Sequence, residues 1–185
     1  MSVPSPQGYA IELYFDPQME ERVLAFRESI YKLGIDPVLG KMGDKPHVSL
    51  AVFSKAEPEN LKQVAFAFSQ RLKRFPVQLD AIGTFPTIDN VLFLTPIPTV
   101  QLLKTHEDFH RMLKKVNLNP SPYYLPNRWV PHCTLEFNLP DEQLNLAVHL
   151  CKQHFTPIRG WFAELGVIAF RPIEYLVEYP LQIQE

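Results

Sequence analysis

Apolar residues along this chain recur with two periods, one typical of strands and one typical of helices. Strand-like segments are short and rich in aromatic and β-branched residues, and they cover residues 9–15, 75–85, 91–95, 163–170 and 174–179. Helix-like segments place apolar side chains three or four positions apart, and they cover residues 18–34, 58–73, 99–116 and 141–155. Two further strands are expected around residues 46–50 and 131–135.

The order of these elements occurs twice. Each half reads strand, helix, strand, helix, strand, and a loop over 35–45 or 117–127 precedes the middle strand. The repeat predicts an α+β fold with two similar lobes, approximately 9–86 and 91–180, in a single domain over 1–185. We expect antiparallel sheets that form a central cleft, with helices on the outer faces. A pseudo-two-fold relation would bring the two middle strands together across that cleft.

Each middle strand carries the pattern Pro-His-x-Ser/Thr-Leu. Because side chains alternate along a strand, His47 and Ser49 share one face, and His132 and Thr134 share one face of the other strand. Two imidazoles suit a displacement at phosphorus, since one can take a proton while the other gives one. Two hydroxyls can hold the phosphate oxygens. A third match, at residues 154–156, ends a helical pattern and runs into a proline, so we discard it.

The paired motifs resemble the signature of the two-histidine (2H) phosphoesterases, which include the RNA 2′,3′-cyclic phosphodiesterases, also called 2′-5′ RNA ligases. The resemblance covers roughly residues 9–180, and its specificity lies in the pair and the duplication, because one motif alone occurs by chance. It implies metal-independent, cofactor-free opening of 2′,3′-cyclic phosphates, on nucleotides or RNA ends, to 2′-phosphates. The reverse ligation is conceivable in principle. The alternative is a nucleotide- or RNA-end-binding module of the same fold with little turnover.

The resemblance also implies roles for the four motif residues. We assign His132 as the base that takes a proton from water and His47 as the acid that protonates the departing ribose oxygen. The near-symmetric motifs do not by themselves decide between the two histidines. Ser49 and Thr134 are expected to stabilise charge on the phosphoryl oxygens.

Aromatic residues near the motifs are further candidates for substrate contacts. Tyr14 and Phe93 lie on the first strand of each half, where they could stack on a nucleobase or simply pack in the core. Tyr124, with Tyr123 before it, lies in the long loop ahead of the second motif and could cover a ligand. Trp129 directly precedes that motif and could equally belong to the core.

Charged residues next to the motifs have two interpretations each. Lys45 and Arg128 could donate to a phosphate or remain solvated loop charges. Glu136 follows the second motif on the same predicted face as His132. It could orient an imidazole or be an ordinary exposed carboxylate.

A competing pattern lies on the helix predicted over residues 99–116. His106 and His110 form a His-Glu-x-x-His match, the zinc-peptidase pattern. A catalytic zinc needs a third protein ligand, and no residue at a usable spacing stands out. We therefore expect no metal, and we place both histidines on the flank of an outer helix, away from the cleft.

Composition narrows the classes of partner. The net charge of −2 argues against binding extended duplex DNA but permits a small phosphate ligand. Cys133 and Cys151 read as buried thiols in a reducing compartment. Residues 1–8 lack the pattern of a secretory signal, and no stretch is long and apolar enough to span a bilayer. We expect a cytoplasmic monomer that does not bind membranes.

Overall fold

A single antiparallel sheet organises the computed structural model, which describes residues 6–183. Five helices, one 3-10 turn and seven strands follow one another along the chain. They are β1 (Gly8–Phe15), α1 (Pro17–Lys32), α2 (Val38–Lys41), β2 (His47–Phe53), α3 (Pro58–Ser69), β3 (Phe75–Thr84), β4 (Leu92–Pro96), α4 (Val100–Lys115), η1 (Pro122–Tyr124), β5 (Cys133–Glu136), α5 (Asp141–His154), β6 (Ile158–Phe170) and β7 (Glu174–Pro180).

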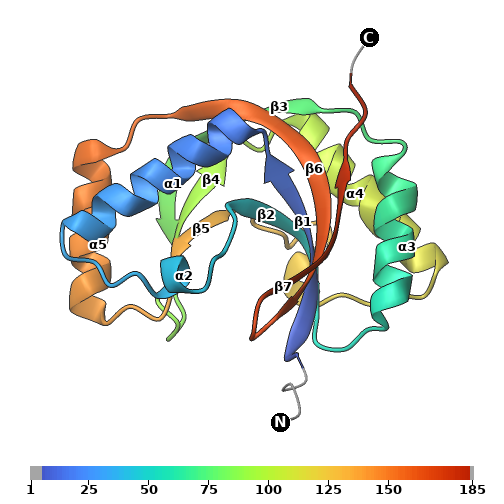
Figure 1. Cartoon of the computed structure of the whole chain (residues 1–185), viewed down its shortest axis with the longest axis horizontal. Helices are drawn as coiled ribbons and strands as arrows, with labels where there is room; N and C mark the ends of the chain where they lie inside the picture. The colour runs from blue at the N-terminus through green and yellow to red at the C-terminus, as the bar shows by residue number, and fades with distance from the viewer. Residues whose placement is uncertain (1–5, 184–185) are drawn as a thin grey trace.

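The longest strand, β6, joins the two halves of the sheet. The strand order is β2-β1-β6-β3-β4-β5, and β7 pairs with β6 beside this path. The amino-terminal part of β6 pairs with β3, and the remainder pairs with β1 on one side and β7 on the other. The sheet curves so that its ends come together: β2 contacts β5 although four strands separate them in the sheet (Figure 1).

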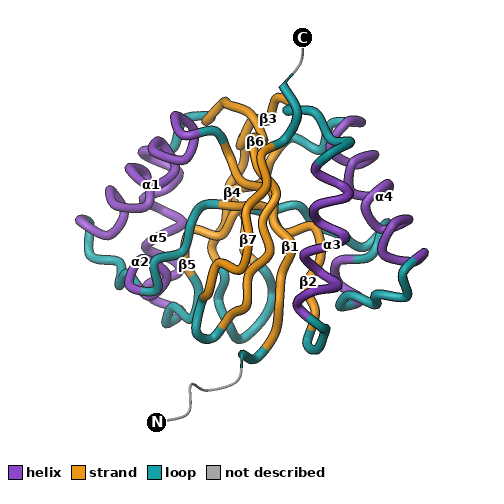
Figure 2. Tube along the Cα trace, turned by 45° about the vertical axis from the view of Figure 1, so that its right-hand side comes forward, coloured by secondary structure: helices purple, strands orange, loops and turns teal. Residues whose placement is uncertain are grey.

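Helices cover the two halves of the sheet in separate pairs. On one side of the molecule α1 packs beside α5; α1 contacts β6 and β1, and α5 contacts β3 and β4 (Figure 2). On the other side α3 packs against α4 and contacts β6, β7 and β1. Each pair combines one helix from the first part of the chain with one from the second. The expected α+β architecture with outer helices is confirmed. The contiguous lobes over 9–86 and 91–180 are not what forms, because α1 and β3 belong to the half completed by β4, β5 and α5.

The strand register shows the internal repeat directly. The trio β6-β1-β2 corresponds to the trio β3-β4-β5, and in each trio a motif strand lies at the edge. Glu12 of β1 pairs with Ser49 of β2, and Phe93 of β4 pairs with Thr134 of β5. Glu12 and Phe93 therefore occupy equivalent positions beside the two motif hydroxyls.

A glycine on the third strand faces each of these positions. Gly166 of β6 pairs with Glu12, and Gly83 of β3 pairs with Phe93. A Cβ at Gly166 would collide with the ring of Tyr14, and a Cβ at Gly83 would collide with the ring of Phe93. The two glycines thus make room for the rings that lie behind the motif strands.

The apolar sides of the motif strands form part of the core, as the alternation predicted. Val48 and Leu50 are fully buried, and so are Cys133 and Leu135 on the other strand. Cys151 is also buried, and both cysteines are free thiols. Burial raises the pKa of Cys133 to about 12. No helix in the described part of the chain is long and apolar enough to cross a membrane.

Two local details differ from the sequence expectation. The loop predicted over 35–45 contains the short helix α2. The strand β5 begins at Cys133, so His132 lies just before the strand rather than within it. A hydrogen bond holds the segment just before β5 against β4: the Thr95 hydroxyl donates to the carbonyl oxygen of Pro131 at 2.9 Å.

Candidate active site

The two motif strands meet at a cleft of about 260 Å³. Its polar side chains include Glu12, His47, Ser49 and Thr134. Apolar residues from β1, β2, α2 and β6 and from the segments just after α2, β5 and β6 supply much of the remaining wall; they include Leu39, Met42, Phe137, Phe170 and Ile173. The structure therefore brings three of the four motif residues to one cavity. His132 is not among the residues that line it and lies beside it, two positions before Thr134.

One carbonyl oxygen and two carboxyl groups surround the ring of His47. Its Nδ1 lies 2.8 Å from the carbonyl oxygen of Lys45, so Nδ1 carries a proton. Its Nε2 lies 3.2 Å from a carboxylate oxygen of Glu12. The carboxylate of Asp44 approaches Nδ1 at 3.6 Å. A carboxylate on each side of the ring favours the imidazolium form.

His132 repeats the first of these contacts but not the others. Its Nδ1 donates to the carbonyl oxygen of Val130 at 2.7 Å, so the lone pair of the neutral ring is on Nε2. Two phenyl rings flank the imidazole: Phe85 at 5.0 Å and Phe93 at 5.3 Å between centroids. These surroundings are apolar and favour the neutral form.

The pKa values of the two histidines therefore move in opposite directions. Burial alone would lower the pKa of His47, but Glu12 and then Asp44 raise it above the ordinary histidine value. Burial lowers the pKa of His132, and positive charge on His47 lowers it further. The opposite shifts favour a protonated His47 beside a neutral His132, which would be a proton donor beside a proton acceptor.

The two motif hydroxyls are open to a ligand. Ser49 and Thr134 both line the cleft, and neither hydroxyl bonds another side chain or carbonyl within residues 6–183. Their backbones are well held: Trp129 Nε1 donates to the Ser49 carbonyl oxygen at 3.0 Å, and Arg27 donates to that of Thr134 at 2.9 Å. Rigid backbones with unpaired hydroxyls are what a phosphate-binding site requires.

Three buried charged residues around the motifs were missed from the sequence: Glu12, Arg27 and Asp44. Arg27 of α1 is 2% exposed and donates to the Asp44 carbonyl oxygen at 3.1 Å as well as to Thr134 of β5. It also forms an ion pair with the Asp44 carboxylate at 3.4 Å. Arg27 therefore ties the loop before one motif to the strand of the other. The signal for Glu12 was a lone carboxylate inside an apolar strand.

Tyr14 and Phe93 are core residues and do not present a free ring for stacking. Tyr14 is 1% exposed, and its hydroxyl donates to the second carboxylate oxygen of Glu12 at 2.8 Å. Phe93 is 5% exposed and packs against Phe85 and His132. Of the two interpretations that the sequence left open for these rings, the structure shows core packing. Each ring supports a site residue.

Lys45 and Arg128 also lie away from the cleft. The ammonium of Lys45 pairs with Glu178 at 2.7 Å, 5.3 Å above the ring of Tyr14. Lys45 serves the site through its carbonyl oxygen, not its charge. Arg128 is exposed and does not line the cleft. A different cation does: Arg171, at the β6–β7 turn, which the sequence did not single out.

Tyr124 lines the cleft as expected for a residue of the loop before the second motif. Burial raises the pKa of its hydroxyl to about 12, so it stays protonated and can donate a hydrogen bond. Trp129 is half-buried, and its indole stacks on His106 with 3.9 Å between ring centroids and 2° between planes. Trp129 therefore positions the backbone of Ser49, with one face of its indole covered by His106, and it is not among the residues that line the cleft.

His106 and His110 are buried, so the expectation that they lie on the flank of α4 is wrong, although neither of them lines the cleft. His106 Nε2 lies 2.9 Å from the Tyr124 carbonyl oxygen, and His110 Nε2 lies 3.0 Å from that of Leu50. The two rings connect α4 to the loop and the strand that line the cleft. Among residues 6–183 no group of three His, Cys, Asp or Glu side chains could hold a metal ion.

Glu136 does not orient an imidazole and is not exposed. It is 0% exposed and accepts hydrogen bonds from the Tyr31 hydroxyl at 2.9 Å and from the backbone N–H groups of Leu39 and Phe137. A bulge at Leu92 and Phe93 in the β4–β5 pairing shifts the register after Thr134. Glu136 consequently anchors α1 and α2 beside the cleft.

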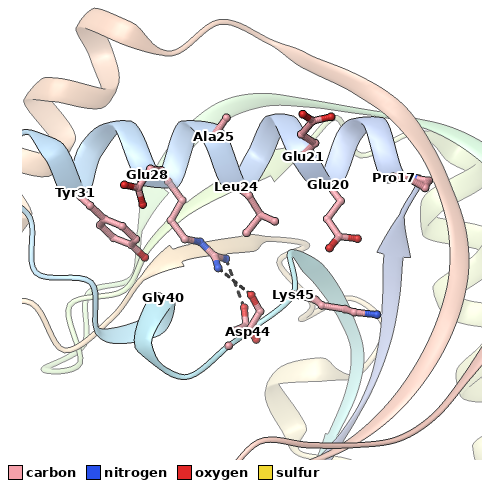
Figure 3. A pocket seen from close by; sticks show the side chains of 12 residues that line it. Pro17, Glu20, Glu21, Leu24, Ala25, Glu28, Tyr31, Gly40, Asp44 and Lys45 are labelled. Carbon is pink, nitrogen blue, oxygen red and sulfur yellow. Dashed lines mark hydrogen bonds and ion pairs between the residues drawn. The ribbon is translucent and has the colours of Figure 1, made fainter.

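A larger hollow of about 820 Å³ lies under α1 and is not the candidate site (Figure 3). Carboxylates of Glu20, Glu21 and Glu28 lie along it, and Lys45 points across one end (Figure 3). None of the described residues that line it is a histidine, and its carboxylates disfavour a phosphate ligand. Asp44 and Arg27 form the wall between this hollow and the cleft.

The buried histidine pair of α4 predicts an acid-sensitive fold. Burial lowers the pKa of His106 to about 4 and also lowers that of His110. Below the ordinary histidine pKa of about 6.5, the unfolded chain takes up protons that the folded chain does not, so stability falls as the pH drops from there toward 4. We expect His106→Gln to reduce this fall by up to about 1.4 kcal/mol for each pH unit. Urea denaturation at pH 5 and pH 7.5 measures it, and an unchanged pH dependence in the variant would contradict the assignment.

Comparison with known proteins agrees with the motif resemblance. The sequence model of the 2′-5′ RNA ligase superfamily matches residues 13–171. Among solved structures, E. coli LigT complexed with 3′-AMP is 16% identical with a TM-score of 0.64, over 96% of this chain and 99% of that chain. TT0787 of Thermus thermophilus is 13% identical with a TM-score of 0.61, over 96% of this chain and 100% of that chain.

A third solved structure, Kluyveromyces marxianus Usb1 with uridine monophosphate, is 16% identical with a TM-score of 0.51, over 94% of this chain and 97% of that chain. No curated protein matches the sequence. At these identities the solved structures show a shared fold, while the superfamily match extends over most of the chain. The chain therefore belongs to the 2′-5′ RNA ligase superfamily, the group of two-histidine phosphoesterases that its paired motifs resemble.

Proposed function

We propose that the chain is a metal-independent phosphodiesterase that opens 2′,3′-cyclic phosphates, on nucleotides or at RNA ends, to 2′-phosphates. The observation that carries this proposal is the opposite shift of the two histidine pKa values beside two unpaired hydroxyls. General acid–base catalysis needs one group protonated and one unprotonated at the same pH. Superfamily membership and structural relatives that bind 3′-AMP and uridine monophosphate support the same class of substrate.

The proposed reaction assigns one proton transfer to each histidine. His132 Nε2 takes a proton from water as the water oxygen bonds to phosphorus. The bond between phosphorus and the ribose 3′ oxygen breaks, and His47 Nε2 gives its proton to that oxygen. Ser49 and Thr134 donate hydrogen bonds to the non-bridging oxygens, where negative charge accumulates. The product is a 2′-phosphomonoester with a free 3′-hydroxyl, and the proton balance is restored through solvent.

The substrate is expected to be small at its reacting end. The cleft of about 260 Å³ has room for a terminal nucleotide rather than a duplex, and the net charge of −2 provides no extended basic surface. Arg171 and Tyr124 are the cation and the phenol that line the cleft beside the motif residues. We propose them as contacts to the sugar or to a further phosphate.

The test is a panel of substrates incubated with the protein in EDTA. The panel contains 2′,3′-cyclic mononucleotides, short RNA ending in a cyclic phosphate and 2′-5′ linked dinucleotides, with products separated by chromatography. We expect at least one cyclic phosphate to be opened to its 2′-monoester. Binding of these ligands with no product from any of them would instead support the nucleotide-binding module.

The two hydroxyls give a prediction of their own. Ser49→Ala and Thr134→Val preserve the shape of each strand but remove a donor to the phosphate. Each should reduce kcat/KM by an amount equivalent to about 1.5–3 kcal/mol, the range for a hydrogen bond to a charged group. Melting temperatures should change little, because both side chains face the cleft.

The control for this prediction is Cys133→Ser. Cys133 lies between His132 and Thr134 in the sequence, and its side chain is fully buried. The substitution should therefore lower the melting temperature and leave kcat/KM of the folded protein nearly unchanged. If Cys133→Ser abolished turnover in a folded protein while Thr134→Val had no effect, the assignment of strand faces would be wrong.

A further inference from the structure

One carboxylate breaks the symmetry of the duplicated site. Glu12 and Phe93 occupy equivalent register positions, beside Ser49 and Thr134 respectively. At this position one half of the molecule places a carboxylate 3.2 Å from the Nε2 of its motif histidine. The other half places a phenyl ring 5.3 Å from the ring of its histidine. The motifs themselves are nearly identical, so this position distinguishes the two histidines chemically.

We propose that Glu12 is the positioning residue that fixes which histidine is the acid, by holding the transferable proton on His47 Nε2. This inference rests on the proposed function, because the proton it holds is the one that leaves with the ribose oxygen. The geometry supports it in two steps. Nδ1–H of His47 donates a hydrogen bond to the Lys45 carbonyl oxygen, so the proton available for catalysis must be on Nε2. Glu12 is the acceptor that faces Nε2.

Glu12 is itself held in place for this task. It is 2% exposed, and the Tyr14 hydroxyl donates to its second oxygen at 2.8 Å, so the first oxygen points at His47. Burial raises the pKa of Glu12 to about 7, and His47 opposes that rise. The pair therefore shares one proton near neutral pH. A buried carboxylate is costly to ionise without such a partner.

Glu12 should affect catalysis through the fraction of molecules in which His47 is charged while His132 is neutral. Two equivalent histidines with ordinary pKa values would have the required one charged and the other neutral in at most about one quarter of molecules. Glu12 raises the pKa of one histidine while Phe93 and Phe85 leave the other in apolar surroundings. Separation of the two pKa values raises the fraction of molecules with the required combination above that limit.

Other charged or titratable groups also face the Glu12–His47 pair, so the effect of Glu12 must be isolated from theirs. They come from several elements around the pair: Tyr14, Arg27, Asp44, Tyr124, His132, Cys133 and Tyr175. Asp44 is neutralised in part by Arg27 and acts on Nδ1 rather than Nε2. A variant at Glu12 leaves all of these groups unchanged.

The experiment compares the wild-type protein with Glu12→Gln, which keeps the size of the side chain and removes its charge. The pKa of His47 is measured by NMR from the Cε1–H signal, without any substrate. We expect it to fall in the variant by about one to three pH units, the range for the loss of a nearby opposite charge. The pKa of His132 should stay the same or rise slightly, since it loses repulsion from His47.

The rate profile provides the second readout. In Glu12→Gln the alkaline limb of the pH profile of kcat/KM should move to lower pH by the same amount as the His47 pKa, while the acidic limb remains. A purely structural role would instead reduce the rate equally at every pH. The matched control is Glu136→Gln, another buried carboxylate with hydrogen bonds to Tyr31 and two backbone N–H groups but none to a histidine. It should shift neither limb.

The possible outcomes separate this inference from the proposed function. If the wild-type protein opens no cyclic phosphate but Glu12→Gln lowers the His47 pKa, the proposed function fails and the role of Glu12 in holding the proton remains. If Glu12→Gln leaves the His47 pKa unchanged in a folded protein, the inference is wrong whatever the activity. Should Glu12→Gln fail to fold, Glu12→Asp keeps the charge at a greater distance, and an unchanged His47 pKa there would also overturn the inference.

Discussion

Replacing either His47 or His132 with alanine should lower kcat by roughly 100-fold or more, the usual loss when a general acid or base is removed. The reason is geometric: each ring presents Nε2 for proton transfer because a carbonyl oxygen binds its Nδ1, at 2.8 Å in His47 and 2.7 Å in His132. Each histidine has a different transfer to perform, so neither can stand in for the other. Steady-state kinetics on the best substrate of the panel measure the loss.

A matched control is available within the chain. His154 begins the third, discarded His-x-Thr match and is exposed at the end of α5. His154→Ala should therefore retain the wild-type rate.

The wild-type pH profile of kcat/KM should be bell-shaped, with an acidic limb from His132 and an alkaline limb from His47, because their pKa values move below and above the ordinary value. Near-wild-type activity in either motif variant would refute the two-histidine mechanism.

The second large effect is expected on stability. Arg27→Met should reduce the free energy of unfolding by about 3–5 kcal/mol, as when one partner of a buried ion pair is removed. The variant loses the hydrogen bonds to the carbonyl oxygens of Asp44 and Thr134 and leaves the Asp44 carboxylate buried with little compensation. Urea denaturation followed by circular dichroism measures the change.

Two further variants test the physical reason for this loss. Arg111→Met on α4 removes an arginine that also contacts two carboxylates, Glu107 and Asp108, but at 61% exposure of its side chain. It should cost no more than about 1 kcal/mol, as exposed ion pairs do. Adding Asp44→Asn to Arg27→Met should recover part of the lost stability by removing the stranded charge. A loss below about 1 kcal/mol in Arg27→Met would show that Arg27 does not join the motif strands as described.

Periodicity in the sequence was sufficient for the elements but not for their arrangement. The alternation in the two motifs correctly placed Val48, Leu50, Cys133 and Leu135 in the core. The repeat of element order predicted two similar lobes, yet the sheet is continuous, and its halves exchange elements. The exchange depends on β6, which is long enough to pair with both β1 and β3, and strand length alone does not reveal such a pairing.

The candidate site shows the same limit at the level of single residues. The motif residues were identified because hydroxyl and imidazole alternate within one short segment. Glu12, Arg27 and Asp44 act through contacts to segments distant in sequence, and such contacts have no local pattern. Tyr14 and Phe93 were placed on the correct strands, but their burial depends on how the sheet curves and on Gly166 and Gly83 behind them.

Among residues 6–183 no group of three His, Cys, Asp or Glu side chains could hold a metal ion. The sequence argued against zinc at His106 and His110 because no third ligand stood out at a usable spacing. Their position on the helix was nevertheless misjudged, because the apolar stripe of α4 did not indicate that both rings would bind carbonyl oxygens of the neighbouring strand and loop. A histidine on the edge of an apolar stripe can be a core residue when its nitrogens find acceptors.

The most direct test of the account follows the phosphorus atom itself. A 2′,3′-cyclic mononucleotide that the protein opens in the substrate panel is incubated with the protein in excess EDTA. ³¹P NMR distinguishes the cyclic diester from the 2′- and 3′-monoesters. The account predicts conversion to the 2′-monoester at the same rate with and without EDTA, and no conversion by the variant that carries both His47→Ala and His132→Ala. Loss of turnover in EDTA that zinc restores, or unchanged turnover in the double variant, would contradict it.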